Sequence, residues 1–263
     1  MPSDRTPVLF VLAHPDDEFA CSMWMRALVC EGRRVGVAYL TDGGFGGQAT
    51  ARREAESLRV LGRLGVAAAD VAFLGRLHGW PDGGLHGHLD QAAARLGEWV
   101  DGFGGDASLV VPAWEGGHQD HDATHLVGWS VARVRGFRDV WQIPLYTGAG
   151  LPGPFFRVLR TLRENGPVEA YRASWRERLE AIGLCFEYAS QWRTWVGLLP
   201  FLTVHLLLAG TFPRQRLDPR RLHEAPHAGR PLYERRGFLS QAAFRAEADR
   251  FISLNLRLHG SET

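Results

Sequence analysis

Lysine is absent from the 263-residue sequence, so all 30 of its basic residues are arginines. This absence excludes a lysine Schiff base, a lysine general base and the phosphate-binding lysine of Walker-type loops. The arginines are balanced by 29 acidic residues, which gives a formal net charge of +1. Because no basic surplus exists to neutralise a phosphate backbone, nucleic-acid binding is not expected.

Cysteine is scarce as well. Cys21, Cys30 and Cys185 show no CxxC spacing, which excludes a disulfide framework and an all-cysteine zinc site. The pattern fits a reducing compartment, and we predict a cytoplasmic protein. The N-terminal apolar run that ends at Ala13 is too short for a secretory signal and is expected to be a buried strand.

Apolar residues make up 45% of the chain, enough for a full hydrophobic core. Short apolar runs alternate with stretches of helical spacing. Strands are expected at 7–13, 34–41, 70–75, 108–114 and 140–146, and helices at 19–30, 51–64, 90–100 and 121–134. This alternation predicts an α/β fold with a Rossmann-like parallel sheet flanked by helices. Ligands of such sheets bind beyond the carboxyl ends of the strands.

The last third of the chain follows a Gly/Pro-rich stretch at 148–154. We therefore predict a catalytic core at 1–147 and a C-terminal extension at 148–263, a helical and irregular cap that shapes the substrate site. Within it, the run at 195–212 lacks formal charges but contains Pro200 and His205. These residues favour a buried helix, with a surface groove, a membrane-contacting segment or a transmembrane helix as alternatives.

Two strings of histidines and carboxylates follow the first and fourth predicted strands, HPDDE and HQDH. Either string alone could be a capped helix start, but both fall at the same edge of the sheet. His14, Asp17 and His121 would supply the two nitrogens and one oxygen of a catalytic zinc site with an open fourth position. Asp16 would be free to act as a base on the attacking water, and His118 is a candidate acid.

The strings AHPDDE and GGHQDHD resemble the two signatures of the PIG-L/LmbE family, zinc-dependent de-N-acetylases of N-acetylglucosamine-containing and related substrates. The similarity covers residues 7–147 and includes TDG, RxxE and WPDG strings between the two signatures. It implies a metal-dependent amide hydrolase in which His14, Asp17 and His121 bind Zn²⁺ and Asp16 is the general base.

The resemblance implies further roles around this centre. His118 matches a histidine that, when protonated, stabilises the oxyanion or protonates the leaving amine. Asp120 would support His118 through the far ring nitrogen. Activity would then need one deprotonated and one protonated group, which predicts a bell-shaped pH profile.

Four residues are expected to contact the substrate. Arg53 matches an arginine that reaches the active site in relatives, although an exposed helix arginine paired with a glutamate is the alternative. Asp42 and Asp82 are weaker candidates, because Asp-Gly turns explain them equally well. Trp80 lies in a predicted site loop and could stack on a sugar ring or an acyl chain.

The expected partner is a small N-acylated amino sugar or glycoconjugate, with no nucleic acid and with membrane contact only as a lesser alternative. The apolar C-terminal third leaves open a zinc amidase for a non-sugar or longer-chain N-acyl substrate. A non-catalytic, Rossmann-like nucleotide-binding protein is a further alternative. It is disfavoured because two carboxylates stand where a glycine-rich phosphate loop would be needed.

Overall fold

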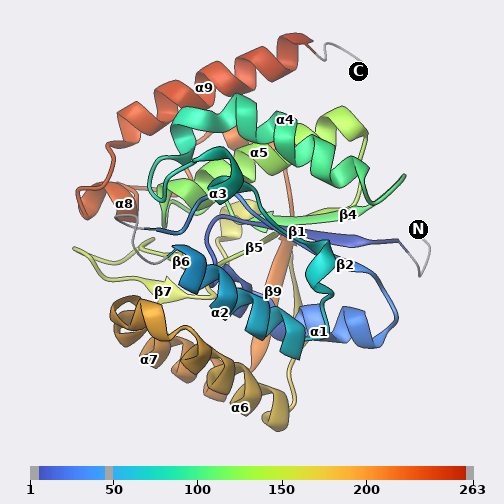
Figure 1. Cartoon of the computed structure of the whole chain (residues 1–263). Coiled ribbons are helices and arrows are strands. Elements are labelled where there is room, and N and C mark those ends of the chain that lie inside the picture. The colour runs from blue at the N-terminus through green and yellow to red at the C-terminus, as the bar shows by residue number, and fades with distance from the viewer. Residues whose placement is uncertain (1–5, 45–49, 259–263) are drawn as a thin grey trace.

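A seven-stranded sheet crosses the molecule, in the order β3-β2-β1-β4-β5-β9-β8, with helices on both faces (Figure 1). The computed structural model describes residues 6–44 and 50–258. All five predicted strands are present and parallel: β1 (Val8–Leu12), β2 (Val35–Tyr39), β3 (Val71–Phe73), β4 (Ser108–Pro112) and β5 (Val140–Ile143). The predicted α/β fold with a Rossmann-like sheet is confirmed.

Strand β1 lies in the interior of the sheet, between β2 and β4, and every one of its residues is buried. Val8 pairs with Val35 of β2 on one side and with Ser108 of β4 on the other. The order of the strands reverses between β1 and β4, which opens a crevice at their carboxyl ends. Both polar strings of the sequence begin at this crevice.

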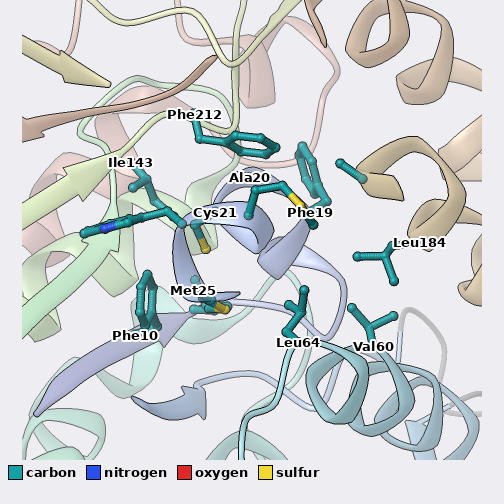
Figure 2. Packing of buried hydrophobic residues seen from close by; sticks show 14 of the residues in the cluster. Phe10, Phe19, Ala20, Cys21, Met25, Val60, Leu64, Ile143, Leu184 and Phe212 are labelled. Carbon is teal, nitrogen blue, oxygen red and sulfur yellow. The ribbon is translucent and has the colours of Figure 1, made fainter. Parts of the chain in front are cut away.

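The two faces of the sheet have separate cores, because side chains alternate along each strand. Val8, Phe10 and Leu12 of β1 join one core, and Leu9 and Val11 join the other. Figure 2 shows part of the first core, in which Phe10 and Met25 belong to the same cluster as Val60 and Leu184. The first face is covered by α1 (Ser22–Cys30), α2 (Thr50–Arg63), α6 (Trp175–Leu184) and α7 (Trp192–Leu208); the second by α3 (Leu74–His78), α4 (Leu89–Asp101), α5 (Gln119–Arg135), α8 (Leu232–Arg235) and α9 (Gln241–Leu258).

The residues after 147 contribute to the same sheet. Strands β8 (Val168–Arg172) and β9 (Thr211–Arg216), which the sequence did not predict, extend it antiparallel beyond β5. A separate two-stranded sheet joins β6 (Tyr146–Thr147) and β7 (Arg157–Val158). The C-terminal residues therefore supply strands as well as covering helices, and the division at 147/148 stays a prediction.

The apolar run at 195–212 forms most of α7 and the start of β9. One face of α7 is buried through Trp195, Leu198, Leu202 and Leu206, but Val196 is 68% exposed. The predicted buried helix is thus buried on one side. Among the described residues, no helix is both long and apolar enough to cross a bilayer. Of the predicted glycine-rich turn after β2, residues 45–47 lie outside the described part of the chain.

Candidate active site

The loop after β1 turns sharply and is held by its own carboxylates. Asp17 Oδ2 accepts hydrogen bonds from the backbone N–H groups of Ala13 at 3.0 Å and His14 at 2.8 Å. Asp16 adopts φ 130° and ψ −17°, a strained conformation for a residue with a Cβ. Its N–H donates to Glu18 Oε2 at 3.0 Å. The strained turn places the side chains of His14, Asp16 and Asp17 on the wall of one cavity.

The loop after β4 approaches the same place. A Cβ on Gly117 would lie 1.9 Å from the Tyr146 carbonyl oxygen, so this path requires glycine. His118 then caps α5, its Nδ1 accepting the backbone N–H of Asp120 at 3.2 Å. His121 follows in the first turn of α5. Because β1 and β4 are neighbours, His121 reaches the loop after β1.

The three predicted metal ligands lie together. One ligand atom from each of His14, Asp17 and His121 lies within 4.8 Å of the other two. His121 Nε2 is 3.1 Å from Asp17 Oδ1, and His14 Nδ1 is 3.6 Å from Asp17 Oδ2. The other nitrogen of His121 is buried and has no hydrogen-bond partner among the described residues. Two imidazoles and a carboxylate in this arrangement fit a divalent cation.

A second group shares His14 and could also hold a metal ion: His14, Asp82, His118 and Asp120. His14 Nε2 lies 3.1 Å from Asp120 Oδ2 and 3.3 Å from Asp82 Oδ1. Burial disfavours the charged imidazolium, but the surrounding carboxylates, Asp82 first, raise the pKa of His14 well above its ordinary value. The site therefore concentrates negative charge that a cation at either group would balance.

Arg53 reaches this centre from α2, as predicted. Its guanidinium lies 3.2 Å from Asp82 and 3.6 Å from Asp16, and it also donates to the carbonyls of Gly43 and Pro15. Burial raises the pKa of Asp16 well above the ordinary carboxylate value, while the Arg53 charge works in the opposite direction. Asp16 is thus a buried carboxylate with a raised proton affinity, as a general base requires.

The cavity has a volume of about 430 Å³. Its wall contains the predicted residues His14, Asp16, Asp17, Arg53, Asp82, His118 and His121. Phe19, Tyr146, Gln191, Arg193, Thr194, Leu198, Arg236 and Phe238 also line it, and the sequence predicted none of these. Most of the second set comes from beyond residue 147, where no short motif marks a site residue.

Two predicted substrate residues have other roles. Trp80 is fully buried, stacks on His78 at a centroid distance of 5.1 Å and does not line the cavity, so its predicted substrate contact is wrong. Asp42 does not line it either. Asp42 Oδ1 accepts the N–H groups of Gly44 and Asp82 at 2.9 Å each, which makes Asp42 the turn residue that positions Asp82.

The predicted support of His118 by Asp120 needs correction. The Asp120 carboxylate accepts from the backbone N–H groups of Gly83 and Leu85 and lies against His14, whereas it is 3.9 Å from His118 Nδ1. Burial and the nearby His14 lower the pKa of His118 to about 4. His118 is therefore neutral near pH 7. Because Nδ1 accepts a backbone N–H, the ring proton belongs on Nε2.

A smaller cavity adjoins the catalytic one. We call it the side pocket; it measures about 250 Å³ and is lined by Tyr146, Phe156, Arg193, Thr194, Gly197, Leu198 and Arg236. The two cavities share Tyr146, both arginines, Thr194 and Leu198.

Comparison with known families agrees with this geometry. The family model described as "PIG-L: GlcNAc-PI de-N-acetylase" matches residues 9–132. This segment is a PIG-L domain. The PIG-L domain contains every predicted metal ligand, together with Asp16, Arg53, Asp82 and His118. The predicted enzyme class, a hydrolytic de-N-acetylase, is supported by this assignment.

Solved structures similar to the chain share its fold. Teicoplanin deacetylase Orf2 in a zinc-inhibited form is 18% identical, with a TM-score of 0.61 over 81% of this chain and 100% of that one. N,N'-diacetylchitobiose deacetylase from Pyrococcus horikoshii is 18% identical, with a TM-score of 0.53 over 84% of this chain and 86% of that one. The pseudoaglycone deacetylase Dbv21 is 18% identical, with a TM-score of 0.57 over 81% and 99%. A comparison with curated protein sequences gave no match.

The side pocket extends beyond the PIG-L domain. Tyr146, Phe156, Arg193 and Arg236 all follow residue 132, where the family match ends. The catalytic loops are thus those of the PIG-L domain, and residues after 132 supply part of the cavity wall.

Proposed function

We propose that the chain is a zinc-dependent hydrolase that removes the acetyl group from the amide nitrogen of an N-acetylated amino sugar or glycoconjugate. The observation that carries this proposal is the convergence of His14, Asp17 and His121 beside the strained, cavity-facing Asp16. The PIG-L domain and the similarity in fold to a deacetylase of N,N'-diacetylchitobiose support the choice of an amino-sugar substrate. A cytoplasmic location belongs to the same proposal.

His14, Asp17 and His121 would hold the metal, which, when bound, polarises the amide carbonyl and acidifies water. Asp16 takes a proton from the attacking water. The Nε2–H of His118 donates a hydrogen bond to the carbonyl oxygen as negative charge develops on it. Asp16 then returns its proton to the amine nitrogen as the C–N bond breaks, so that acetate and a free amine leave. Arg53 and Asp82 hold Asp16 and His14 in place.

The direct test is acetate release from methyl N-acetylglucosaminide by the purified chain. The zinc-loaded protein is expected to be active and the chelator-treated protein inactive, with activity restored by added Zn²⁺. Asp16→Asn, loaded with metal, serves as the inactive control. Absence of acetate release from a folded protein that holds one equivalent of metal would contradict the proposed function.

A longer acyl chain is the second candidate. Phe19, Leu198 and Phe238 give the cavity an apolar wall. An amide series from acetyl to octanoyl on one amino sugar separates the candidates. A value of kcat/KM that falls with chain length supports the acetyl substrate, and one that rises supports the acyl substrate.

A further inference from the structure

The side pocket carries positive charge without compensation. Arg193 and Arg236 line it, and no acidic residue does so among the described residues. Within residues 6–44 and 50–258, neither arginine forms an ion pair. Arg193 lies over the ring of Trp192 at 5.5 Å. Arg236 lies over Phe156 at 5.0 Å and donates to the Pro154 carbonyl at 3.3 Å. Since a guanidinium has five N–H donors, most of them remain available to a ligand.

The segments that carry Arg193 and Arg236 are each hydrogen-bonded to a catalytic loop. Two residues before Arg193, Gln191 Nε2 donates to the carbonyl of Pro15 at 2.8 Å. Arg236 directly follows α8, whose Leu232 N–H donates to the Gly116 carbonyl at 2.7 Å. The position of each guanidinium is therefore coupled to the loop that carries a predicted metal ligand.

Tyr146 connects the side pocket to the catalytic centre. Its ring lies 5.3 Å from that of His121 and 5.7 Å from that of Phe156, and it lines both cavities. A ligand that reaches from the metal site to the side pocket would pass over this ring. Aromatic faces of this kind suit the apolar face of a sugar.

The two cavities share Arg193 and Arg236 but differ in their acidic residues. Asp16, Asp17 and Asp82 line the catalytic cavity, whereas no described acidic residue lines the side pocket. A negative charge on the substrate is therefore favoured in the side pocket, away from the three carboxylates, while a neutral acetamido group occupies the catalytic cavity.

We propose that the side pocket is an anion subsite, in which Arg193 and Arg236 bind a phosphate or carboxylate on the part of the substrate remote from the N-acetyl group. The inference rests on the proposed function and narrows its substrate class to anionic N-acetylated amino sugars. Guanidinium groups suit both anions because their paired donors match two oxygens.

The test compares substrates that differ only in charge. Acetate release by the zinc-loaded protein is measured for methyl N-acetylglucosaminide, for N-acetylglucosamine 1-phosphate and for the 2-carboxyethyl glycoside of N-acetylglucosamine. We expect kcat/KM to be about tenfold higher for one or both anionic substrates. This preference should fall as ionic strength rises. The phosphate and carboxylate arms show which anion the subsite prefers.

Gly197 offers a matched pair of variants. It lies on α7 in the wall of the side pocket, and an added Cβ would meet no atom within 4 Å. Gly197→Glu and Gly197→Gln are close in size and differ in charge. We expect Gly197→Glu to abolish the preference for the anion, relative to Gly197→Gln.

Arginine variants test the two donors directly. Arg193→Met and Arg236→Met should each reduce the ratio of anionic to neutral kcat/KM several-fold, and the double variant should bring it near one. Arg138→Met is the control, because Arg138 is exposed in the loop before β5, at the other edge of the sheet. The control removes the same charge and should leave the ratio unchanged.

The outcomes separate the subsite from the proposed function. Equal turnover of neutral and anionic substrates overturns the subsite and leaves the de-N-acetylase intact. A preference that survives Gly197→Glu and both arginine variants also overturns it, because the anion then binds elsewhere, for example at the metal. If no substrate is turned over, the proposed function fails. Calorimetric binding of N-acetylglucosamine 1-phosphate to the wild type and the double variant then still tests the subsite, since equal affinities overturn it.

Discussion

Asp16 and Asp17 are neighbours in the sequence with different surroundings in the structure. Asp17 contacts His121 and two backbone N–H groups, whereas Asp16 faces the cavity and Arg53. Asp17→Asn should therefore release the metal, because it removes one of three ligands. Asp16→Asn should keep the metal and lower kcat by roughly two to four orders of magnitude. Elemental analysis and steady-state kinetics measure both effects. If Asp16→Asn lost the metal and Asp17→Asn kept it, Asp16 would be the metal ligand and Asp17 the general base.

Arg53 sets the pH at which Asp16 can act. Burial raises the pKa of Asp16, and the Arg53 cation lowers it by favouring the carboxylate. Arg53→Met should raise that pKa further, so Asp16 becomes protonated at a higher pH as acid is added. The acid limb of the kcat/KM profile should move to higher pH, while Arg53→Lys, which keeps the charge, should move it less. If the acid limb of the kcat/KM profile did not move in Arg53→Met, that limb would report the titration of a group other than Asp16.

The Asp120 carboxylate contacts His14 in this structure. If His14 binds the metal through Nδ1, its Nε2–H donates to Asp120, 3.1 Å away, and this contact orients the ligand. Asp120→Asn should weaken metal affinity by about 10- to 100-fold. Competition with a chromophoric chelator measures the affinity. An unchanged affinity combined with a displaced pH profile would return Asp120 to the predicted role beside His118.

At the scale of elements, one buried carboxylate links α2 to the chain that enters α7. Glu56 is 1% exposed and accepts hydrogen bonds from the backbone N–H of Ser190 at 2.9 Å and from its hydroxyl at 2.5 Å. The contact fixes the segment that carries Gln191 and Arg193 into the cavity wall.

Ser190→Ala should lower the free energy of unfolding by about 1–3 kcal/mol, because it removes a hydrogen bond to a buried charge. It should also raise KM more than it lowers kcat, since the cavity wall loosens while the metal loops stay in place. Urea unfolding and steady-state kinetics measure the two effects. In a double-mutant cycle with Glu56→Gln, strictly additive losses would show that the two residues are not coupled.

At the scale of the whole molecule, Glu115 makes stability depend on pH. It is fully buried where β4, β6 and α5 meet, and Oε1 accepts the N–H groups of Leu145 and Tyr146. Burial raises its pKa to about 8 from an ordinary 4.5. Because the pKa of Glu115 is higher in the folded state, its contribution to stability is fully present at pH values below its unfolded-state pKa. This contribution is lost as the pH rises through its folded-state pKa.

Glu115→Gln cannot ionise and should escape this loss. Relative to wild type, its free energy of unfolding should increase between pH 4.5 and 8 by on the order of 4 kcal/mol. Urea unfolding of the metal-free proteins at several pH values measures the difference. A difference that stays constant over this range would show that Glu115 keeps an ordinary pKa.

The five parallel strands and the two loops of the candidate metal site can be predicted from local sequence patterns. Strand and helix periodicities are local, and parallel strands place their carboxyl ends at one edge, so HPDDE and HQDH had to meet there. That reasoning needs only neighbouring residues and the rules of sheet topology. It predicted that His14, Asp17 and His121 lie close together, and the structure groups them; their role as metal ligands stays a prediction. Arg53 was expected at the same centre from a family resemblance.

The contacts of individual side chains depend on segments that are distant in the sequence, so they could not be predicted from it. Asp120 faces His14, 106 residues away, and Trp80 turns into the core, because packing and backbone hydrogen bonds select one rotamer among several that the sequence allows equally. Strand β9 joins the sheet through pairing of Gln215 with Gln142 of β5, and β8 pairs in turn with β9; no local pattern reveals either pairing. For the same reason, Arg193 and Arg236 meet at the side pocket only after the chain has folded.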